Sequence, residues 1–596
     1  MLRGAPAPKP RFETLLAALV NAASTPLGIT FVGLDEREST LSYAQLLQSS
    51  RAVAGALERL GVLPGDRVAL ILPTGASFPI AFFGALFAGA VPVPLYPPVR
   101  FGRLPEYHAQ TARMLSAVQA TVVLADAQVR RMLGQSVERA RPPLGCHTVE
   151  SLLERDGVPM ERKVSGRALA LVQFSSGSTV DPKPVALTHE NLVSHCEAIR
   201  QLIPEEEPLS HRGVSWLPLY HDMGLIGFLL TGIYYPGALT LIAPEHFLAK
   251  PALWLKTLSR HRGTLSASPN FGYGLCLKRI KDEELEGVDL SSWAVAFNGA
   301  ESVSPALVRE FTERFKRFGF RASAVRPVYG LSEATLAVTF PPQRSVLKTR
   351  RVDAAQLALC GEVRELSRAP GSDSENSGQV REIASVGQPV PGVDIDIRDA
   401  HGASVGDDTL GRLFVRGPSV MQGYLGQPAP TPSVIQNGWL DTGDLGFSTG
   451  GELYIAGRAK DVVIIRGANH TPQTFEEYAG QVPGVRVGCV VALGFHPEDG
   501  ASEELLILAE RTAEAGPILE DEISRHVARH TGIRPHTVKL LEPGTLPRTS
   551  SGKLRRSEAL GRYLSGNLMP PARLGAVLMA AEFVKSAFAF RRAERP

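Results

Sequence analysis

The alternation of helix-like and strand-like segments over residues 40–340 most restricts the fold of this 596-residue chain. LSYAQLLQSSRAVAGALERLG has helical periodicity and ends at a glycine, and the DRVALILP that follows is typical of a short buried strand. FFGALFAGAVPVPL, ALALVQF and LTLIAPEHF continue the pattern. Strands that alternate with helices predict an α/β fold with a mainly parallel sheet covered by helices on both faces.

The chain is too long for one core, so several domains are expected. A polar stretch at residues 366–379 is interpreted as a loop, and short alternating strands with Gly turns follow it, which predicts a small β-rich subdomain. Beyond this, strands and helices mix again. We therefore expect a large N-terminal domain over residues 1–457 and a small C-terminal α+β domain over residues 458–596.

Composition and charge disfavour several classes of protein. A net charge of +3 argues against nucleic acid as the main partner. The five cysteines are scattered and form no C-x-x-C pair, so a reducing cytoplasm is expected and a zinc site is disfavoured. The most apolar run, residues 78–98, continues for about 14 residues before Pro92, short of the roughly 20 that a membrane-spanning helix needs. A buried helix followed by a strand is expected there, and residues 1–23 are expected to contain an amphipathic helix.

SSGSTVDPKP, residues 175–184, has the chemistry of a phosphate-binding loop. Its hydroxyls and backbone N–H groups can face phosphate oxygens, and Lys183 adds a cation. It is not a Walker loop, because Pro182 stands where that pattern requires glycine. Val180 and Pro184 restrict the backbone where glycine would allow close approach to phosphate. We interpret the run as a working loop with weaker or slower triphosphate handling; a solvated turn is the alternative.

Six further motifs follow the loop in a fixed order. They are WLPLYHDMGLIG (216–227), FNGAESV (297–303), VYGLSEAT (328–335), WLDTGDLG (439–446), GRAKDVVIIRGANHTPQTFE (457–476) and LPRTSSGKLRRS (546–557). With the phosphate loop they resemble the motifs of the adenylate-forming enzymes, which include acyl-CoA synthetases, peptide-synthetase adenylation domains and luciferases. The resemblance extends from about Leu41 to Leu564, nearly the whole chain.

Several segments resemble one branch of that superfamily, the fatty acyl-AMP ligases. AVPVPLYPP, SPNFGYGLC and IIRGANHTPQ have its character, and residues 341–385 resemble the insertion that distinguishes it from CoA synthetases. The resemblance implies ATP- and Mg²⁺-dependent activation of a fatty acid to acyl-AMP and pyrophosphate. The acyl group is then passed to the phosphopantetheine thiol of an acyl carrier protein or of a polyketide or peptide synthase. An acyl-CoA ligase and a catalytically weak, lipid-binding or scaffolding protein remain as alternatives.

The resemblance also implies roles for individual residues. Lys553 is expected to bridge the carboxylate and the α-phosphate during adenylation, where cations stabilise the developing charge. Lys460 matches the hinge position about which the small C-terminal domain is expected to rotate between the two half-reactions, so that domain is expected to be mobile. The carboxylate of Glu333 is expected to bind Mg²⁺. The nucleotide-binding residues implied by the motifs are Ser175, Ser176, Gly177, Ser178, Thr179, Lys183, Gly299, Ala300, Glu301, Tyr329, Ser332, Asp444 and Arg458.

Within this set, Thr179 and Lys183 are expected to hold the β- and γ-phosphates. Tyr329 is expected to lie on the adenine, with the small residues Gly299 and Ala300 letting backbone approach the purine. Asp444, assisted by Arg458, is expected to accept hydrogen bonds from the ribose hydroxyls.

The acyl group and the C-terminal tail have less specific signals. His221 is expected to close the acyl site, and Asn270 and Phe271 are expected in the wall of an acyl pocket, with core packing as the alternative. RLGAVLMAAEFVKSAFAFRR, residues 573–592, is amphipathic with basic ends. We expect it to pack on its own domain; docking to an acidic carrier protein or a membrane surface is the alternative.

Overall fold

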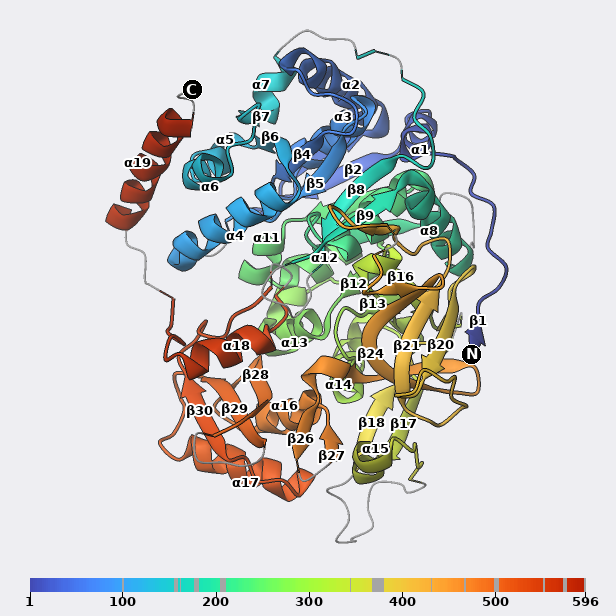
Figure 1. Cartoon of the computed structure of the whole chain (residues 1–596), viewed down its shortest axis with the longest axis vertical. Helices are drawn as coiled ribbons and strands as arrows, with labels where there is room; N and C mark the ends of the chain where they lie inside the picture. The colour runs from blue at the N-terminus through green and yellow to red at the C-terminus, as the bar shows by residue number, and fades with distance from the viewer. Residues whose placement is uncertain are drawn as a thin grey trace.

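The computed structural model describes residues 1–98, 101–154, 159–160, 162–175, 182–203, 211–342, 345–366, 380–429, 431–465, 468–497, 503–549, 552–571 and 576–593 (Figure 1). The elements up to β25 build the larger part of the molecule, and those from β26 to α18 gather at one end of it (Figure 1). Among the described helices, none combines the length and the apolarity needed to cross a bilayer.

Two mainly parallel sheets form the frame of the larger part. The first has the order β14 (Val325–Pro327), β13 (Val295–Asn298), β12 (Leu265–Ser268), β10 (Arg212–Ser215), β11 (Ala238–Ile242), β2 (Gly28–Val32) and β3 (Glu38–Ser42), and only β3 runs antiparallel to its neighbour. The second is wholly parallel, in the order β5 (Val91–Pro94), β4 (Arg67–Ile71), β6 (Ala120–Ala125) and β7 (Cys146–Thr148). The predicted α/β class is confirmed.

Helices connect and cover these strands. They are α1 (Leu15–Ala22), α2 (Tyr43–Leu60), α3 (Ser77–Phe87), α4 (Leu104–Ala117), α5 (Ala127–Arg130), α6 (Gly134–Ala140), α7 (Val149–Leu153), α8 (His189–Leu202), α9 (Asp222–Gly224), the π-helical η2 (Leu225–Leu230), α10 (Thr231–Tyr234), α11 (Pro244–Ala249), α12 (Ala252–Arg260), α13 (Asn270–Arg279) and α14 (Pro305–Phe315).

Local sequence explains the bounds of α2 and α3. Ser42 and Gln45 form a capping box at the start of α2, and Gly61 ends the helix with φ 97°, a conformation that glycine adopts without strain. In α3, every residue from Phe78 to Leu86 is buried, and β5 follows. The apolar run of residues 78–98 is therefore a buried helix and strand, as predicted.

A β-rich unit follows in the chain. Its sheet has the order β1 (Leu2–Arg3), β20 (Asp394–Arg398), β21 (Gly411–Arg416), β24 (Trp439–Thr449) and β23 (Ile435–Gln436), with β25 (Glu452–Arg458) also paired to β24. Smaller sheets join β15 (Tyr329–Gly330), β16 (Ala337–Phe340) and β19 (Gln388–Pro389), and β22 (Gly423–Tyr424), β9 (Pro184–Thr188) and β8 (Leu169–Phe174). The predicted β-rich subdomain is thus present, and the N-terminal β1 completes its edge.

The described part of the 341–385 segment forms an antiparallel pair, β17 (Thr349–Asp353) with β18 (Val380–Ala384), and a helix, α15 (Ala354–Cys360). Val352, Leu357 and Ile383 pack with Phe447 and Tyr454 of the β-rich unit. Helix α15 also contacts β27 of the C-terminal region. The segment therefore lies between the β-rich unit and the C-terminal region.

Residues beyond Arg458 form sheets and cores of their own. Their elements are β26 (Val463–Ile465), β27 (Ala468–His470), α16 (Pro472–Gln481), β28 (Val485–Phe495), β29 (Glu504–Arg511), α17 (Leu519–Thr531), β30 (Thr537–Leu541) and α18 (Arg556–Leu564). Two buried clusters lie entirely within residues 463–568. This organisation supports a separate C-terminal unit of mixed α and β structure.

The last helix, α19 (Ala576–Ala593), does not pack on that unit. It lies against α6 of the larger part, where Ser586 and Ala589 are buried (Figure 1). Gly134 N donates to Ser586 Oγ at 2.8 Å, Arg592 forms an ion pair with Glu138, and Phe590 joins a core cluster of the larger part. The expectation that the tail packs on its own domain is wrong, because its small and aromatic face fits α6.

Candidate active site

A cavity of about 210 Å³ opens where the carboxyl ends of the parallel strands face the C-terminal unit. Parallel α/β sheets commonly bind ligands at this edge, because the loops that leave the strands converge there. Eight of the predicted site residues line this one cavity: Ser175, His221, Ala300, Tyr329, Ser332, Glu333, Arg458 and Lys553. Ser176, Gly177, Ser178 and Thr179 lie outside the described residues.

The loop after β13 has room only for small residues. A Cβ atom at Gly299 would lie 2.8 Å from Val328 O, and Ala300 adopts a φ of 70°, which is costly for a residue with a side chain. Glu301 Oε1 accepts a hydrogen bond from Phe271 N at 3.2 Å. The loop is thus held in a strained shape at Ala300, which lines the cavity.

Tyr329, Asp444 and Arg458 form one hydrogen-bonded group. The Tyr329 hydroxyl donates to Asp444 Oδ2 at 2.6 Å, and Arg458 Nε lies 3.2 Å from Asp444 Oδ1. Burial raises the pKa of Asp444, and Arg458 opposes that shift. Asp444 is thus a buried carboxylate flanked by a phenol and a guanidinium, and its role toward a ribose stays a prediction.

The described ends of the phosphate loop are closed by a backbone hydrogen bond from Ser175 N to Lys183 O at 2.9 Å. Pro184 begins β9, so its missing N–H and the extended shape it imposes on the preceding residue fit the start of a strand. Lys183 Nζ lies 4.9 Å from the centre of the Tyr424 ring. The Tyr424 hydroxyl donates to Glu333 Oε1 at 3.0 Å, and burial raises the pKa of Glu333. Val180 lies outside the described residues.

His221, Asp222 and Ser332 form the polar floor of the cavity. Asp222 Oδ1 lies 2.7 Å from His221 Nδ1, and its Oδ2 accepts a hydrogen bond from Ser332 Oγ at 2.6 Å. Burial alone would raise the pKa of Asp222, but His221, Ser332 and Lys553 hold it below its ordinary value. The carboxylate is therefore ionised and attracts a cation into the cavity.

Lys553 is that cation, delivered from the C-terminal unit. Lys553 N donates to Thr549 Oγ1 at 3.0 Å, and Thr549 N donates to Lys553 O at 2.8 Å. Arg548 holds this turn to β28 through hydrogen bonds to Gly552 O and Gly488 O, both at 2.7 Å. Burial lowers the pKa of Lys553, while Asp222, Glu301 and Asp444 oppose that shift. The lysine is thus fixed in a desolvated position facing carboxylates on the larger part.

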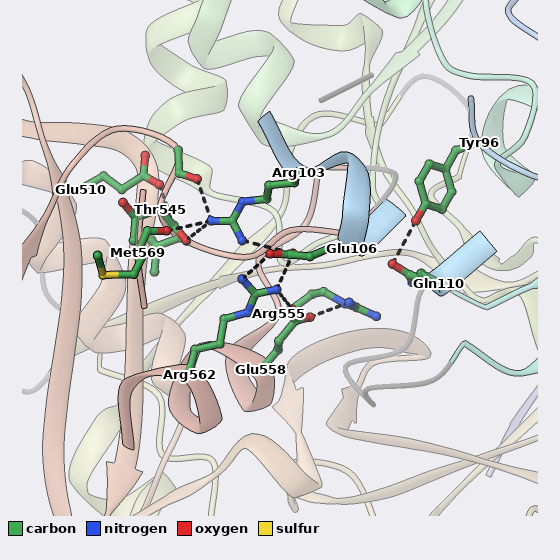
Figure 2. Close-up of polar contacts among 12 residues, drawn as sticks. Tyr96, Arg103, Glu106, Gln110, Glu510, Thr545, Arg555, Glu558, Arg562 and Met569 are labelled. Carbon is green, nitrogen blue, oxygen red and sulfur yellow. Dashed lines mark hydrogen bonds and ion pairs between the residues drawn. The ribbon is translucent and has the colours of Figure 1, made fainter. Parts of the chain in front are cut away.

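A second set of contacts fixes the C-terminal unit in this orientation (Figure 2). Arg562 on α18 forms an ion pair with Glu106 on α4 at 2.7 Å. Arg103 donates to the carbonyl oxygens of Thr545 at 3.0 Å and Met569 at 3.2 Å. These contacts and the cavity position of Lys553 place the molecule in an orientation suited to a step that uses the lysine.

The remaining predicted residues lie beside the cavity. Lys460 is in the short turn after β25, and burial lowers its pKa, with Arg458 adding to the shift. Asn270 does not line the cavity: its side chain donates to Ser302 O at 2.5 Å and accepts from Asn298 Nδ2 at 3.0 Å, so it holds the loop after β13. Phe271 packs edge-on against Trp216 instead of lining the cavity. Their placement in an acyl wall stays a prediction that this geometry does not favour.

Two residues of the site were not predicted. Asp222 stands inside the WLPLYHDMGLIG motif, and its charge in an apolar run was a signal that could have found it. Tyr424 links Lys183 to Glu333 from a segment that carries no motif, so only the fold brings it there.

The chemistry assembled here is that of nucleotide activation of a carboxylate. Arg458 and Lys553 line the cavity, and Lys183 lies beside Tyr424, whose hydroxyl donates to Glu333 of the cavity lining. The cations can offset the charge of an anion attacking a phosphate, which is the main obstacle to that reaction.

The chain belongs to the AMP-binding enzymes, a family of adenylate-forming ligases that use ATP, and the family model matches residues 20–425. It is 34% identical to a provisionally named acyl-CoA synthetase of Caulobacter vibrioides, over 93% of this chain and 96% of the relative. It is 33% identical to JamA of Moorena producens, named as a medium-chain-fatty-acid–[acyl-carrier-protein] ligase, over 94% of this chain and 96% of the relative. A solved structure from a study of fatty acyl-adenylate ligases of E. coli and L. pneumophila superposes with a TM-score of 0.86 at 32% identity, covering 95% of this chain and 99% of that one.

Proposed function

We propose that this enzyme activates a fatty acid with ATP and Mg²⁺ to acyl-AMP and pyrophosphate, and then transfers the acyl group to the phosphopantetheine thiol of an acyl carrier protein. The single observation that carries the proposal is the position of Lys553 in a cavity shared with the nucleotide site and a long apolar channel. The relatives named for fatty-acid–carrier-protein and fatty acyl-adenylate ligation support the substrate class.

In the first half-reaction the fatty-acid carboxylate attacks the α-phosphate of ATP, forms a C–O–P linkage and expels pyrophosphate. Lys553 neutralises charge shared between the carboxylate and the α-phosphate, and Arg458 and Asp444 hold the ribose. In the second half-reaction the thiol attacks the acyl carbon and expels AMP. Lys553 is not needed there, so we propose that the C-terminal unit, from β26 to α18, turns away about Lys460 while α19 stays on α6.

The residues present fit a magnesium ion. Mg²⁺ prefers one or two carboxylates together with substrate phosphates and water. Glu333 offers a half-buried carboxylate near Lys183, the predicted partner of the terminal phosphates, and Tyr424 links the two residues. Among the described residues, no group of three or more His, Cys, Asp or Glu side chains could hold a metal by itself. When bound, the ion would offset negative charge on the triphosphate.

Carrier-protein transfer is favoured over free CoA by the 341–385 segment, which contacts both the β-rich unit and the C-terminal unit. The Caulobacter relative keeps an acyl-CoA ligase as the second candidate. A polyketide or lipopeptide pathway would supply such a carrier. The described structure contains free cysteines only, four buried and Cys360 exposed, which supports a reducing cytoplasm.

The test is incubation of the full chain with ATP, Mg²⁺ and fatty acids of graded length, followed by mass analysis of the products. We expect acyl-AMP to accumulate, CoA to leave it unconsumed, and a phosphopantetheinylated carrier protein to consume it. Rapid formation of acyl-CoA would establish the second candidate instead. Absence of acyl-AMP with every acid would favour a lipid-binding or scaffolding role.

A further inference from the structure

The cavity continues from Lys553 across four strands of the first sheet, from β13 to β11. Phe297 on β13, Ala267 and Leu265 on β12, and Gly213 on β10 line it in turn, and Ala238 at the start of β11 lines its far end. Neighbouring strands lie about 4.8 Å apart, so the three steps from β13 to β11 give this channel a length of about 14 Å. An extended alkyl chain with single bonds near 1.5 Å advances about 1.3 Å per carbon, so about ten carbons fill the channel.

The far end of this channel is polar, unlike its middle. His211, which comes just before β10, lines the cavity, and neither of its ring nitrogens, both buried, has a hydrogen-bond partner within the described structure. Arg200 and Tyr235 also line this end, but they are engaged with other groups: Arg200 Nε donates to Glu197 Oε1 at 2.9 Å, and its guanidinium lies 5.2 Å from the centre of the Tyr235 ring.

An unpaired buried imidazole is unfavourable unless a ligand supplies its partners. A neutral imidazole presents one donor and one acceptor, and a hydroxyl can satisfy either because it both donates and accepts. The methyl end of an ordinary fatty acid can satisfy neither. A binding site whose buried polar group needs a hydrogen bond from the substrate discriminates strongly against substrates that leave this group unpaired.

We propose that the far end of the channel recognises a hydroxyl group at the distal end of a medium-length acyl chain, and that His211 is the residue that determines this specificity. The inference rests on the proposed activation of a fatty acid and adds the chemical class of that acid. His211 acts on binding of the chain and not on the reacting atoms, because about 14 Å of channel separates it from the nucleotide end.

The experiment measures pyrophosphate release by the full chain with two matched pairs of acids: decanoic and 10-hydroxydecanoic acid, and dodecanoic and 12-hydroxydodecanoic acid. We expect kcat/KM to favour the hydroxy acid by on the order of tenfold in at least one pair, mainly through KM. His211→Leu should abolish that preference, and the kcat/KM of the plain acid should rise toward that of the hydroxy acid, because no imidazole is then left unpaired. His211→Gln, which keeps a donor and an acceptor, should restore part of the preference.

His401→Leu is the matched control, because His401 is exposed on a turn and the same substitution there should leave the preference intact. Preference for the plain acid in both pairs, or a preference that survives His211→Leu, would overturn the inference while leaving fatty-acid activation standing. Stronger use of decanedioic acid than of 10-hydroxydecanoic acid would overturn it in favour of an anion site. Failure to form acyl-AMP with every acid would overturn the proposed function, and this inference with it.

Discussion

The ion pair between Glu106 and Arg562 joins α4 to α18 and holds the C-terminal unit in the orientation that buries Lys553 (Figure 2). Arg562 reaches both carboxylate oxygens of Glu106, at 2.7 and 3.4 Å. Burial alone would raise the pKa of Glu106, but Arg562 and Arg103 hold it below its ordinary value. Glu106→Gln removes the charge and keeps the shape, so it should weaken this orientation relative to a rotated one.

The size of the effect follows from the exposure of the pair. The Glu106 side chain is 51% exposed and that of Arg562 is 22% exposed, so solvent screens much of the attraction. Half-exposed pairs contribute about 0.5–1 kcal/mol. Since 1.4 kcal/mol is a factor of ten, the population of the rotated state should rise about two- to fivefold.

The assay separates the half-reactions. Transfer from supplied acyl-AMP to a phosphopantetheinylated carrier needs the rotated state, so at low salt its rate should rise about two- to fivefold in Glu106→Gln. Adenylation should change little while the orientation described here remains the major one. Salt near 1 M should abolish the difference between the variant and the parent, because it screens the pair in the parent.

Glu58→Gln is the control variant. It removes an ion pair with Arg162, at 3.2 Å, within the larger part of the molecule, and should leave transfer unaffected. Unchanged or slower transfer in Glu106→Gln at low salt would refute the idea that this contact stabilises the adenylation orientation.

Three further predictions test the site, the acid sensitivity of the fold and the tail. Lys553→Ala should slow acyl-AMP formation by on the order of 10²-fold or more and spare transfer from supplied acyl-AMP; equal losses in both half-reactions would contradict its assigned role. Burial lowers the pKa of His195 in the folded protein to about 3. As the pH falls below about 6.5, this histidine is therefore protonated in the unfolded chain but not in the folded one. The free energy of unfolding should fall by about 1.4 kcal/mol per pH unit until the pH reaches the pKa of the folded state. His195→Gln keeps an acceptor for its backbone partner and should reduce the loss of urea resistance between pH 6.5 and 5; an identical loss would mean that other groups govern it. In Gly134→Leu a side chain would collide with Ser586, so α19 should detach and trypsin should cleave the tail faster, whereas Gly480→Leu, where a Cβ meets open space, should leave cleavage unchanged; equal cleavage in both variants would show that α19 does not depend on this contact.

Much of the fold and many site residues could be predicted because their signals are local. The caps of α2 stand next to the helix in sequence, and a run too short to cross a membrane was identified as buried by its length alone. The motifs predict a nucleotide site at Tyr329, Asp444, Arg458 and Lys553, and the fold brings these residues together at one cavity. Their residue types reflect the chemistry of phosphate and ribose binding, which acts at each position separately.

Only the tertiary structure decided which distant residues act together. Ser332 meets Asp222 across 110 positions of sequence, and Lys553 reaches the same carboxylate from a separate unit. Helix α19 is buried on α6. Packing on its own unit would require the same amphipathic pattern, so the pattern does not determine which surface the helix packs against. His211 belongs to none of the sequence motifs. Its ring nitrogens have no hydrogen-bond partner in the described structure, and this depends on the fold, which places the start of β10 beside β11 at the end of the channel. The chemistry of each side chain is set by its residue type, whereas its burial and its hydrogen-bond partners depend on how segments far apart in the chain pack against one another.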